Sequence, residues 1–376
     1  MPNTPQSGPH VLIFSGGSAF HALCQALKDH THNSIHLLTP FDSGGSSAAL
    51  RRAFAMPAVG DLRQRLMALA NESAPGNPDV CELCAYRLPL DGSGGEHRAE
   101  LAMMISGQHA LMRGIPAASC SVIARQLQAL FDQLPSDFDL RGACVGNLVL
   151  AGGYLENDRD LLGALSVFSA LVSARGIVRP IVNDHAHLFA ELENGRVLMG
   201  QHELTGKEAS PIESPVRQLF LSRQAQHYEP ARVVLGDSNR SLITSADLIC
   251  FAPGSFYSSL IANLLPEGVG AAIAANRAPK VFIPNLGVDP EQLGMNFQQS
   301  LSELLRYLMQ GATNVKPTDV LTHVITDTQH GLSASSVNHT ALGELGIELI
   351  DLPLVTPQSS PYYDNAKLLP ALLSLL

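Results

Sequence analysis

The candidate catalytic and ligand-binding residues cluster where an apolar segment is followed by the sequence DSGGSS, which begins at Asp42. Glycines free backbone N–H groups to face an anion, and nearby hydroxyls and guanidinium groups add further donors. This stretch therefore predicts a site for a phosphorylated ligand. The candidate phosphate-binding residues here are Gly44, Gly45, Ser46, Ser47, Arg51 and Arg63.

Two aspartates in this region could serve the same ligand. Asp42 ends the apolar segment, where a carboxylate can hold Mg²⁺ on a diphosphate or act as a general base. It is the candidate catalytic residue and the candidate Mg²⁺ ligand, and an Asx-turn cap is the alternative. Asp61 stands at the start of the next predicted helix, either as a ligand-binding residue or as a helix N-cap.

Two other turns share this pattern of small residues between a strand and a helix. The first is SGGS, with candidate ligand-binding residues Gly16, Gly17 and Ser18. It lacks the third glycine of G-x-G-x-x-G, so an ordinary tight turn is the alternative. The second is APGSFYSS at Ala252, where Gly254, Ser255 and Ser258 could bind phosphate or cap the helix.

Three further polar features carry alternatives. Asn147 lies at an apolar helix start and could hold a ribose, a base edge or backbone, because a buried amide needs partners. Cys81 and Cys84 form one C-x-x-C without a second, which favours core thiols over zinc. The histidines of His185–His187 could bind a metal or could be a chance pairing.

The surrounding elements predict where these turns meet. Short apolar strands alternate with helices, and the chain opens with a strand, a turn, a helix and a strand. We expect an α/β fold, Rossmann-like and doubly wound, with a mainly parallel sheet. The three turns would then share the carboxyl edge of that sheet, where ligands bind.

The organisation predicted along the chain is a single α/β domain over residues 1–376. Its nucleotide-binding core spans about 9–60 and 231–354, with a helical insertion at about 61–140. A β-hairpin-rich segment at about 177–222 contains Asn194-Gly195, a strong two-residue hairpin signal. A further parallel strand is expected at Ala231–Val234.

Composition narrows the classes of partner. The net charge is −10, which disfavours nucleic acid but not a small anion near local arginines. Apolar runs fall short of a membrane helix, and the polar amino end is unlike a signal peptide. We therefore expect a cytoplasmic protein with reduced thiols that binds a small molecule, with homo-oligomerisation left open.

With these motifs assembled, the chain resembles the 2-phospho-L-lactate transferase (CofD-like) family, which includes the bacterial gluconeogenesis factors. The matching segments are SGGS at Ser15, FDSGGSSAALR at Phe41, PAVGDLRQRL at Pro57, VGNLVLAG at Val145, AHLFAELENGRVLMG at Ala186, APGSFYSSLIANLL at Ala252 and VFIPNLG at Val281. The resemblance implies a Rossmann-like fold that binds a nucleotide-linked phosphate ligand.

The resemblance implies two different roles. In the enzyme branch, a 2-phospholactyl or phosphoenolpyruvyl group passes from a guanosine diphosphate carrier to a deazaflavin hydroxyl, with Mg²⁺. In the bacterial branch, a UDP-sugar is bound and the role is regulatory. The chain departs from the family pattern at three positions: Ala19 and Ala48 replace glycines, and Ser43 replaces an acid. The missing carboxylate at Ser43 would weaken a Mg²⁺ site more than nucleotide binding.

Two hypotheses therefore stand after reading the sequence. The first is a Mg²⁺-assisted transferase that moves a phospho-organic group from a nucleoside diphosphate carrier to a hydroxyl acceptor. The second is a regulatory protein that binds a nucleotide sugar without turnover. The sequence favours an enzyme of the transferase kind, while the missing acid at Ser43 favours the regulatory role. Neither the base nor the acceptor can be read from these residues.

Overall fold

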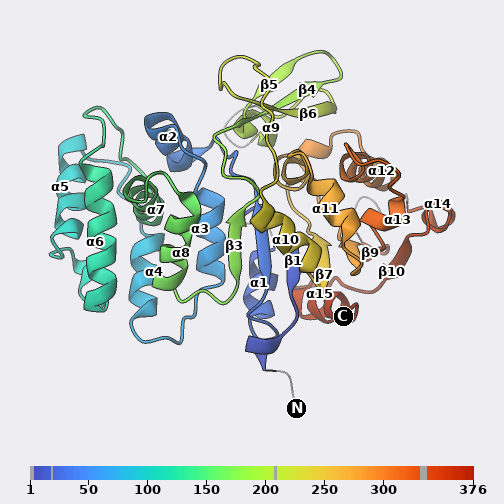
Figure 1. Cartoon of the computed structure of the whole chain (residues 1–376), viewed down its shortest axis with the longest axis horizontal. Helices are drawn as coiled ribbons and strands as arrows, with labels where there is room; N and C mark the ends of the chain where they lie inside the picture. The colour runs from blue at the N-terminus through green and yellow to red at the C-terminus, as the bar shows by residue number, and fades with distance from the viewer. Residues whose placement is uncertain (1–3, 18–19, 207–209, 331–336) are drawn as a thin grey trace.

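A seven-stranded parallel sheet forms the centre of the protein, with the strand order β10-β9-β8-β7-β1-β2-β3 (Figure 1). The computed structural model describes residues 4–17, 20–206, 210–330 and 337–376. The parallel α/β sheet predicted from the sequence is confirmed. Its strands are β1 (Val11–Phe14), β2 (Ile35–Leu38), β3 (Ile177–Pro180), β7 (Leu248–Phe251), β8 (Lys280–Phe282), β9 (His323–Thr326) and β10 (Glu348–Asp351).

The central strands are apolar because both faces of the sheet are covered. Every residue of β1, β2 and β7 is buried, as expected for parallel strands with helices on either side. In the register, Leu12 pairs with Ile35 and Phe14 pairs with Phe251. The rings of Phe14 and Phe251 stack with their centroids 5.6 Å apart.

The strand order reverses between β1 and β7. From β1 the chain moves outward through β2 to β3, and it then returns to β7 and moves the other way. Such a reversal leaves a crevice at the carboxyl ends of the two strands, where ligands of doubly wound sheets bind. The turns that follow β1, β2 and β7 therefore meet at one edge.

Between β2 and β3 the named elements are all helices. They extend beyond the helical segment predicted at 61–140, and Figure 1 shows α4 to α8 stacked beyond β3 at one end of the molecule. Apolar side chains of these helices continue the core from the sheet. The elements are α2 (Gly45–Phe54), α3 (Gly60–Ala68), α4 (Asn77–Ala85), α5 (Gly94–Ile105), η2 (Ala110–Met112), α6 (Ala117–Phe131), α7 (Val145–Glu156) and α8 (Leu161–Leu171).

A small antiparallel sheet follows β3, with the order β5-β4-β6. Its strands are β4 (His187–Leu192), β5 (Val197–Met199) and β6 (Val216–Ser222), and the short helix α9 (Gln201–Thr205) follows β5. The predicted hairpin is confirmed, since Asn194-Gly195 joins β4 to β5 and Gly195 has φ 85°. Figure 1 shows this sheet at the top of the view, above the central sheet.

The remaining elements cover the central sheet. One strand that the sequence predicted in this part of the chain, at Ala231–Val234, is absent from the described residues. Within Ala231–Val234 the described structure has one isolated bridge, from Val234 to Glu267, and no strand. Within the described residues, no helix is both long and apolar enough to span a bilayer. The remaining elements are η1 (Pro5–Ser7), α1 (His21–Leu27), α10 (Asp237–Ser245), η3 (Phe256–Leu260), η4 (Ile261–Leu264), α11 (Val269–Ala275), η5 (Pro290–Gln292), α12 (Phe297–Leu308), α13 (Pro317–Val320), α14 (His339–Glu344) and α15 (Asn365–Leu373).

Candidate functional site

The turn after β1 is tightly enclosed by two other elements, and this explains its glycines. A Cβ added at Gly17 would lie 2.6 Å from the Cα of Asp61 in α3. A Cβ added at Gly16 would lie 2.5 Å from the hydroxyl of Ser259 in η3. Ser18, another predicted ligand residue, lies outside the described residues. Backbone alone fits between these two elements, so Gly16 and Gly17 can present peptide groups at the carboxyl edge.

The side chains of Asp42 and Asp61 both lie at the start of α3, and Asp61 is the second residue of that helix. Asp42 Oδ1 accepts the Gly44 N–H at 3.0 Å, so the Asx-turn alternative is present. Asp42 Oδ2 lies 3.4 Å from where a Cβ of Gly60 would stand. The Asp61 carboxylate lies against Gly17, and Val59 is the residue at the N-cap position. The fold therefore brings Asp42 and Asp61, which are 19 positions apart in the sequence, to the start of one helix.

A chain of side chains links three predicted site residues. Arg63 Nε donates to Asn147 Oδ1 at 3.3 Å, and Asn147 Nδ2 donates to Ser46 Oγ at 3.0 Å. Asn147 is 3% exposed, and its amide is satisfied by side chains rather than by backbone. Gly146 allows this approach, because a Cβ there would lie 3.0 Å from Arg63 Cδ. Ser46, Arg63 and Asn147 thus lie together beside the DSGGSS turn.

Two other predicted phosphate ligands are used inside the fold. The Ser47 hydroxyl accepts the N–H groups of Val59 and Gly60 at 3.3 and 3.4 Å, at the start of α3. Arg51 is 4% exposed and donates to the carbonyls of Phe41, Asp42 and Ala186. Burial lowers the pKa of Arg51 to about 10, against the opposing charge of Asp42. Arg51 is therefore hydrogen-bonded to backbone carbonyls of the β2 turn and of the residue before β4, and it is not exposed to a ligand.

The helix start after β7 is capped by the protein's own carboxylates. Asp289 accepts the Phe256 N–H at 2.7 Å, and Glu291 accepts the N–H groups of Tyr257 and Ser258, each at 2.8 Å. The Ser258 hydroxyl also donates to Glu291. Ser258 is fully buried and Glu291 is 1% exposed. The structure therefore does not bring Ser258 to an open anion site.

Glu291 is an unusual carboxyl group because it is buried. Burial first, and then the charge of Asp289, raise the pKa of Glu291, while the donors on Ser258 and Tyr257 oppose that shift. A carboxyl in this setting holds its proton to a higher pH than an exposed glutamate does. Stability is thereby linked to pH at this point of the fold.

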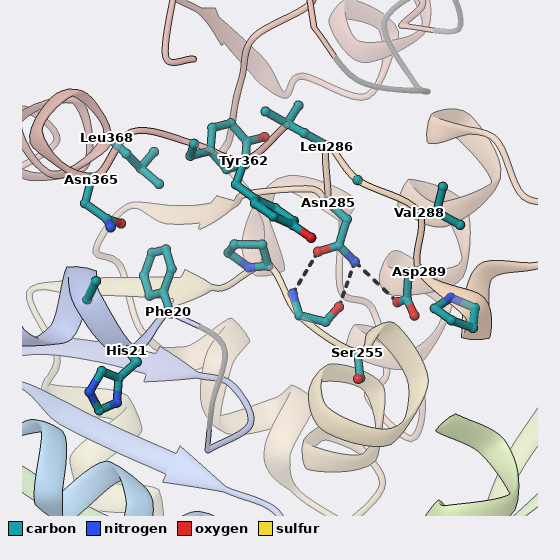
Figure 2. A pocket seen from close by; sticks show the side chains of 16 residues that line it. Phe20, His21, Ser255, Asn285, Leu286, Val288, Asp289, Tyr362, Asn365 and Leu368 are labelled. Carbon is teal, nitrogen blue, oxygen red and sulfur yellow. Dashed lines mark hydrogen bonds between the residues drawn. The ribbon is translucent and has the colours of Figure 1, made fainter. Parts of the chain in front are cut away.

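A cavity of about 560 Å³ lies beside the turns that follow β1 and β7. Figure 2 shows Phe20 and Tyr362 among its lining residues, with Asn285 and Asp289 on the wall formed after β8. This volume is in the range of small-molecule sites. The cavity lies at the reversal of strand order, which is the position that the fold predicts for a ligand.

Two predicted residues line this cavity directly. Gly254 has φ 146° and exchanges two hydrogen bonds with the Asn285 side chain, at 2.8 and 2.7 Å. Ser255 follows it, at the N-cap of η3, and also lines the cavity (Figure 2). Gly254 and Ser255 are thus the part of the late turn that faces open space.

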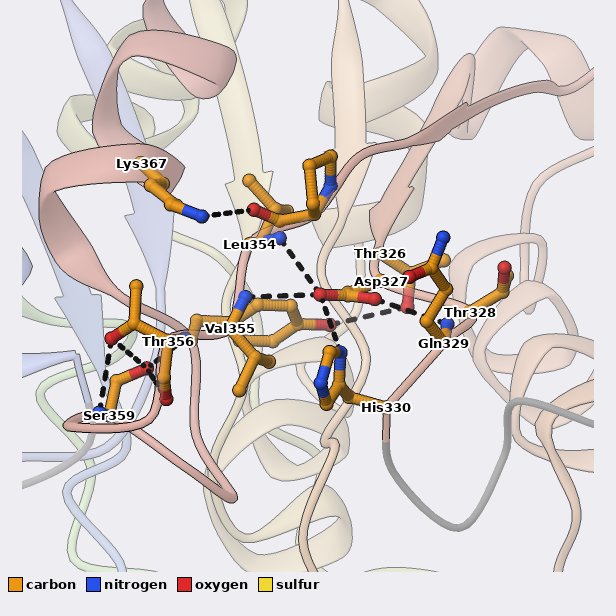
Figure 3. A network of polar contacts seen from close by, with 12 residues as sticks. Thr326, Asp327, Thr328, Gln329, His330, Leu354, Val355, Thr356, Ser359 and Lys367 are labelled. Atoms are coloured by element: carbon orange, nitrogen blue, oxygen red, sulfur yellow. Dashed lines mark hydrogen bonds and ion pairs between the residues drawn. The ribbon is translucent and has the colours of Figure 1, made fainter.

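The carboxyl-terminal wall of the cavity is anchored by Asp327 at the end of β9. Its Oδ2 accepts the N–H groups of Leu354 and Val355 at 2.8 and 3.0 Å and pairs with His330 Nδ1 at 3.0 Å (Figure 3). Burial raises the pKa of Asp327, but these hydrogen bonds outweigh burial and lower it. The segment that carries Tyr362 is thereby fixed to the sheet.

The other polar features of the sequence do not build a metal centre. Across the described ranges, no group of three or more His, Cys, Asp or Glu side chains is placed to hold a metal ion. The rings of His185 and His187 meet edge to face at 4.9 Å, and burial followed by the charge of Arg51 lowers both pKa values to about 4. Cys81 and Cys84 are free thiols. Mg²⁺ remains compatible with the site, because it needs only one or two carboxylates beside phosphate oxygens.

Sequence reasoning missed three residues that shape this edge. Asp289 and Glu291 follow the VFIPNLG segment, but nothing local in that segment indicates which N–H groups they cap. Arg65 is fully buried under the first turn. Its spacing four residues after Asp61 places both on one face of α3, and that spacing could have revealed it.

Comparison with known proteins identifies the family of this chain. A family model described as 2-phospho-L-lactate transferase CofD matches residues 11–351. The chain belongs to this family. Among its CofD-like relatives, a gluconeogenesis factor from Bacillus subtilis is 27% identical over 282 residues, 75% of this chain and 69% of the relative. A gluconeogenesis factor from Listeria monocytogenes is 26% identical over 283 residues, covering 75% and 68%.

A solved structure supports the fold. The crystal structure of a UPF0052 family member from Bacillus halodurans matches with a TM-score of 0.71, covering 98% of this chain and 99% of that one. The two sequences are 22% identical, so this match bears on the architecture alone. This chain therefore shares its fold with that solved structure.

Proposed function

We propose that this protein binds a nucleoside-diphosphate-linked ligand at the carboxyl edge of its sheet. With Mg²⁺, it would transfer a phospho-organic group from that ligand to a hydroxyl acceptor. The observation that carries the proposal is the position of Asp42 and Asp61 at the start of α3, beside the two-glycine turn. Asp61 would supply the second carboxylate that Ser43 does not.

The roles follow from what each group contacts. Asp42 and Asp61 would hold Mg²⁺, which offsets the negative charge of a diphosphate and of the departing nucleotide phosphate. Peptide groups at Gly16 and Gly17 would bind phosphate oxygens, together with the linked pair Ser46 and Arg63. The cavity lined by Phe20 and Tyr362 would take the base or the carried group.

A second candidate is a regulatory protein that binds a nucleotide sugar without turnover. The observation that favours it is the use made of Ser43, which stands where the family resemblance implies an acid. Its hydroxyl lies 2.8 Å from His202 Nδ1 and accepts the His202 N–H at 3.1 Å. This contact joins α9 to the β2 turn, so Ser43 serves the docking of the small sheet.

The experiment is a thermal-shift panel of GDP, UDP, UDP-N-acetylglucosamine and UDP-glucose, each with and without Mg²⁺. A ligand at about 100 times its Kd adds ~2.7 kcal/mol of stability. Stabilisation that requires Mg²⁺ and disappears in both Asp42→Asn and Asp61→Asn supports the transferase site. Stabilisation by a UDP-sugar without Mg²⁺ supports the regulatory role, and silence from all four ligands contradicts both.

The matched control for these variants is Asp132→Asn. Asp132 accepts a hydrogen bond from Gln128 on the exposed surface of the helical segment, far along the chain from the β turns. Its replacement removes the same charge and should leave the ligand-induced shift unchanged. A loss of that shift in Asp132→Asn would mean that net charge, rather than the Asp42 and Asp61 pair, controls binding.

A further inference from the structure

The buried guanidinium of Arg65 is hydrogen-bonded to the turn after β1. Arg65 is fully buried, and one terminal nitrogen donates to the Ser15 hydroxyl at 3.0 Å and to the Gly16 carbonyl at 2.7 Å. The other terminal nitrogen contacts the Cys24 thiol. Asp61, one helical turn earlier on the same face of α3, lies against Gly17. One face of α3 therefore holds both sides of this turn.

The network under the turn continues through neutral groups. Cys24 Sγ lies 3.8 Å from His36 Nδ1, and His36 Nε2 lies 3.0 Å from the Ser34 hydroxyl. Burial, together with the charge of Arg65, holds the pKa of His36 well below its usual value. Burial raises the pKa of the Cys24 thiol. Within this run of side chains, the guanidinium is the charged group.

The geometry of the peptide bond gives this contact a consequence for a ligand. The carbonyl of one residue and the N–H of the next lie in one plane and point in opposite directions across a trans peptide. Arg65 holds the Gly16 carbonyl toward the core, so the Gly17 N–H points the other way. Over the described part of the chain, no acceptor is bonded to that N–H.

We propose that Arg65 is the positioning residue of a diphosphate site at the turn after β1. It orients the Gly17 N–H toward the ligand, and its charge, held in a medium of low polarity behind the turn, favours a more highly charged ligand. The inference rests on the proposed function, because it takes a nucleoside diphosphate as the ligand. Burying an arginine is costly, and a site that gains from its charge gives a reason for keeping it there.

The test compares the affinities of GDP and GMP, and of UDP and UMP, by calorimetry in the presence of Mg²⁺. Arg65→Met should weaken diphosphate binding at least tenfold and monophosphate binding clearly less, so the ratio of the two affinities falls. A purely structural role would lower both affinities together or neither. A folded Arg65→Met protein with an unchanged ratio overturns the inference.

Lys280→Met is the matched control for this variant. Lys280 is also buried, at 2% exposure, and its ammonium donates to the carbonyls of Asn276 and Ala278 at 2.6 and 3.0 Å. It begins β8 at the amino edge of the sheet, opposite the candidate site. Losing this buried cation should leave the ratio of diphosphate to monophosphate affinity unchanged. A fall in that ratio as large as the one in Arg65→Met would contradict a specific role for Arg65.

Two milder variants decide the question if Arg65→Met does not fold. Arg65→Lys keeps the charge but cannot hold Ser15 and Gly16 with the same fork, and Ser15→Ala removes one of the two acceptors. Each should weaken diphosphate binding about threefold, and wild-type affinity in both overturns the inference. If the wild-type protein binds neither GDP nor UDP, the proposed function itself fails, and that result is visible before any variant is made.

Discussion

The turn after β1 and the turn after β7 have similar sequences and different electrostatic surroundings. Both follow a buried strand, contain small residues and lead toward a helix. At the first turn, Asp61 and Arg65 enclose the glycines but leave the Gly17 N–H unused within the described structure. At the late turn, Asp289 and Glu291 already accept the N–H groups that a phosphate would bind. A helix start is an anion site only where the fold has not supplied the anion itself.

The largest effect is expected from a side chain added to the turn after β1. Gly17→Ala would place a Cβ 2.5 Å from Asp61 Oδ1 and 2.6 Å from its Cα, so backbone must shift. We expect nucleotide binding to fall at least a hundredfold, with a loss of about 2–3 kcal/mol in the free energy of unfolding. Titration calorimetry and urea unfolding measure the two effects.

Gly94→Ala provides the matched control. A Cβ there would meet no described atom within 4 Å, at the exposed start of α5. Binding and stability should both stay close to wild type. Equal binding losses in the two variants would show that the close contact at Gly17 is not what the ligand depends on.

The late turn should respond to pH rather than to ligand. The raised pKa of Glu291 means that the folded state holds this proton above the ordinary value of 4.5. The stability that this proton confers is present at low pH and is lost as the pH rises through the folded-state pKa. As the pH rises from 4.5 to above the folded-state pKa of Glu291, the unfolding free energy of the wild type should fall by about 2 kcal/mol relative to that of Glu291→Gln. Urea unfolding at a series of pH values measures this difference. A parallel pH dependence in the two proteins would rule out Glu291 as its source.

The linked side chains beside DSGGSS should affect the ligand but hardly the fold. Arg63→Ala removes the donor to Asn147 and one positive charge next to Ser46. Diphosphate affinity should fall about tenfold, roughly 1.4 kcal/mol, as measured by calorimetry. Arg63→Lys should recover part of this loss, and unchanged affinity in Arg63→Ala would remove Arg63 from the site.

The smallest effects separate two serines of the late turn. Ser258→Ala removes a donor to buried Glu291 and should cost about 1 kcal/mol in unfolding free energy without changing nucleotide affinity. Ser255→Ala, beside the cavity, should lower affinity two- to threefold with little change in stability. The reverse pattern would mean that the Glu291 cap opens for the ligand.

Local patterns were enough to predict much of the architecture. Fully apolar runs such as Val11–Phe14 are typical of strands covered on both faces, and the parallel sheet follows from their alternation with helices. Asn194-Gly195 predicted its hairpin because a two-residue turn depends on its own backbone. The strand expected at Ala231–Val234 is absent because no neighbouring strand of the described structure pairs with it beyond the single bridge from Val234 to Glu267.

The fold class and the sheet edge where the glycine turns meet could be predicted from the sequence, since strand burial and turn chemistry are properties of short segments. The order of the strands, and which N–H groups of those turns already have an acceptor, depend on the tertiary structure. Asp289 lies 33 positions after Phe256, and Arg51 reaches Ala186 across 135 positions. A donor bonds to the acceptor that the folded chain brings within about 3 Å of it. That distance cannot be read from the separation of the two residues in the sequence.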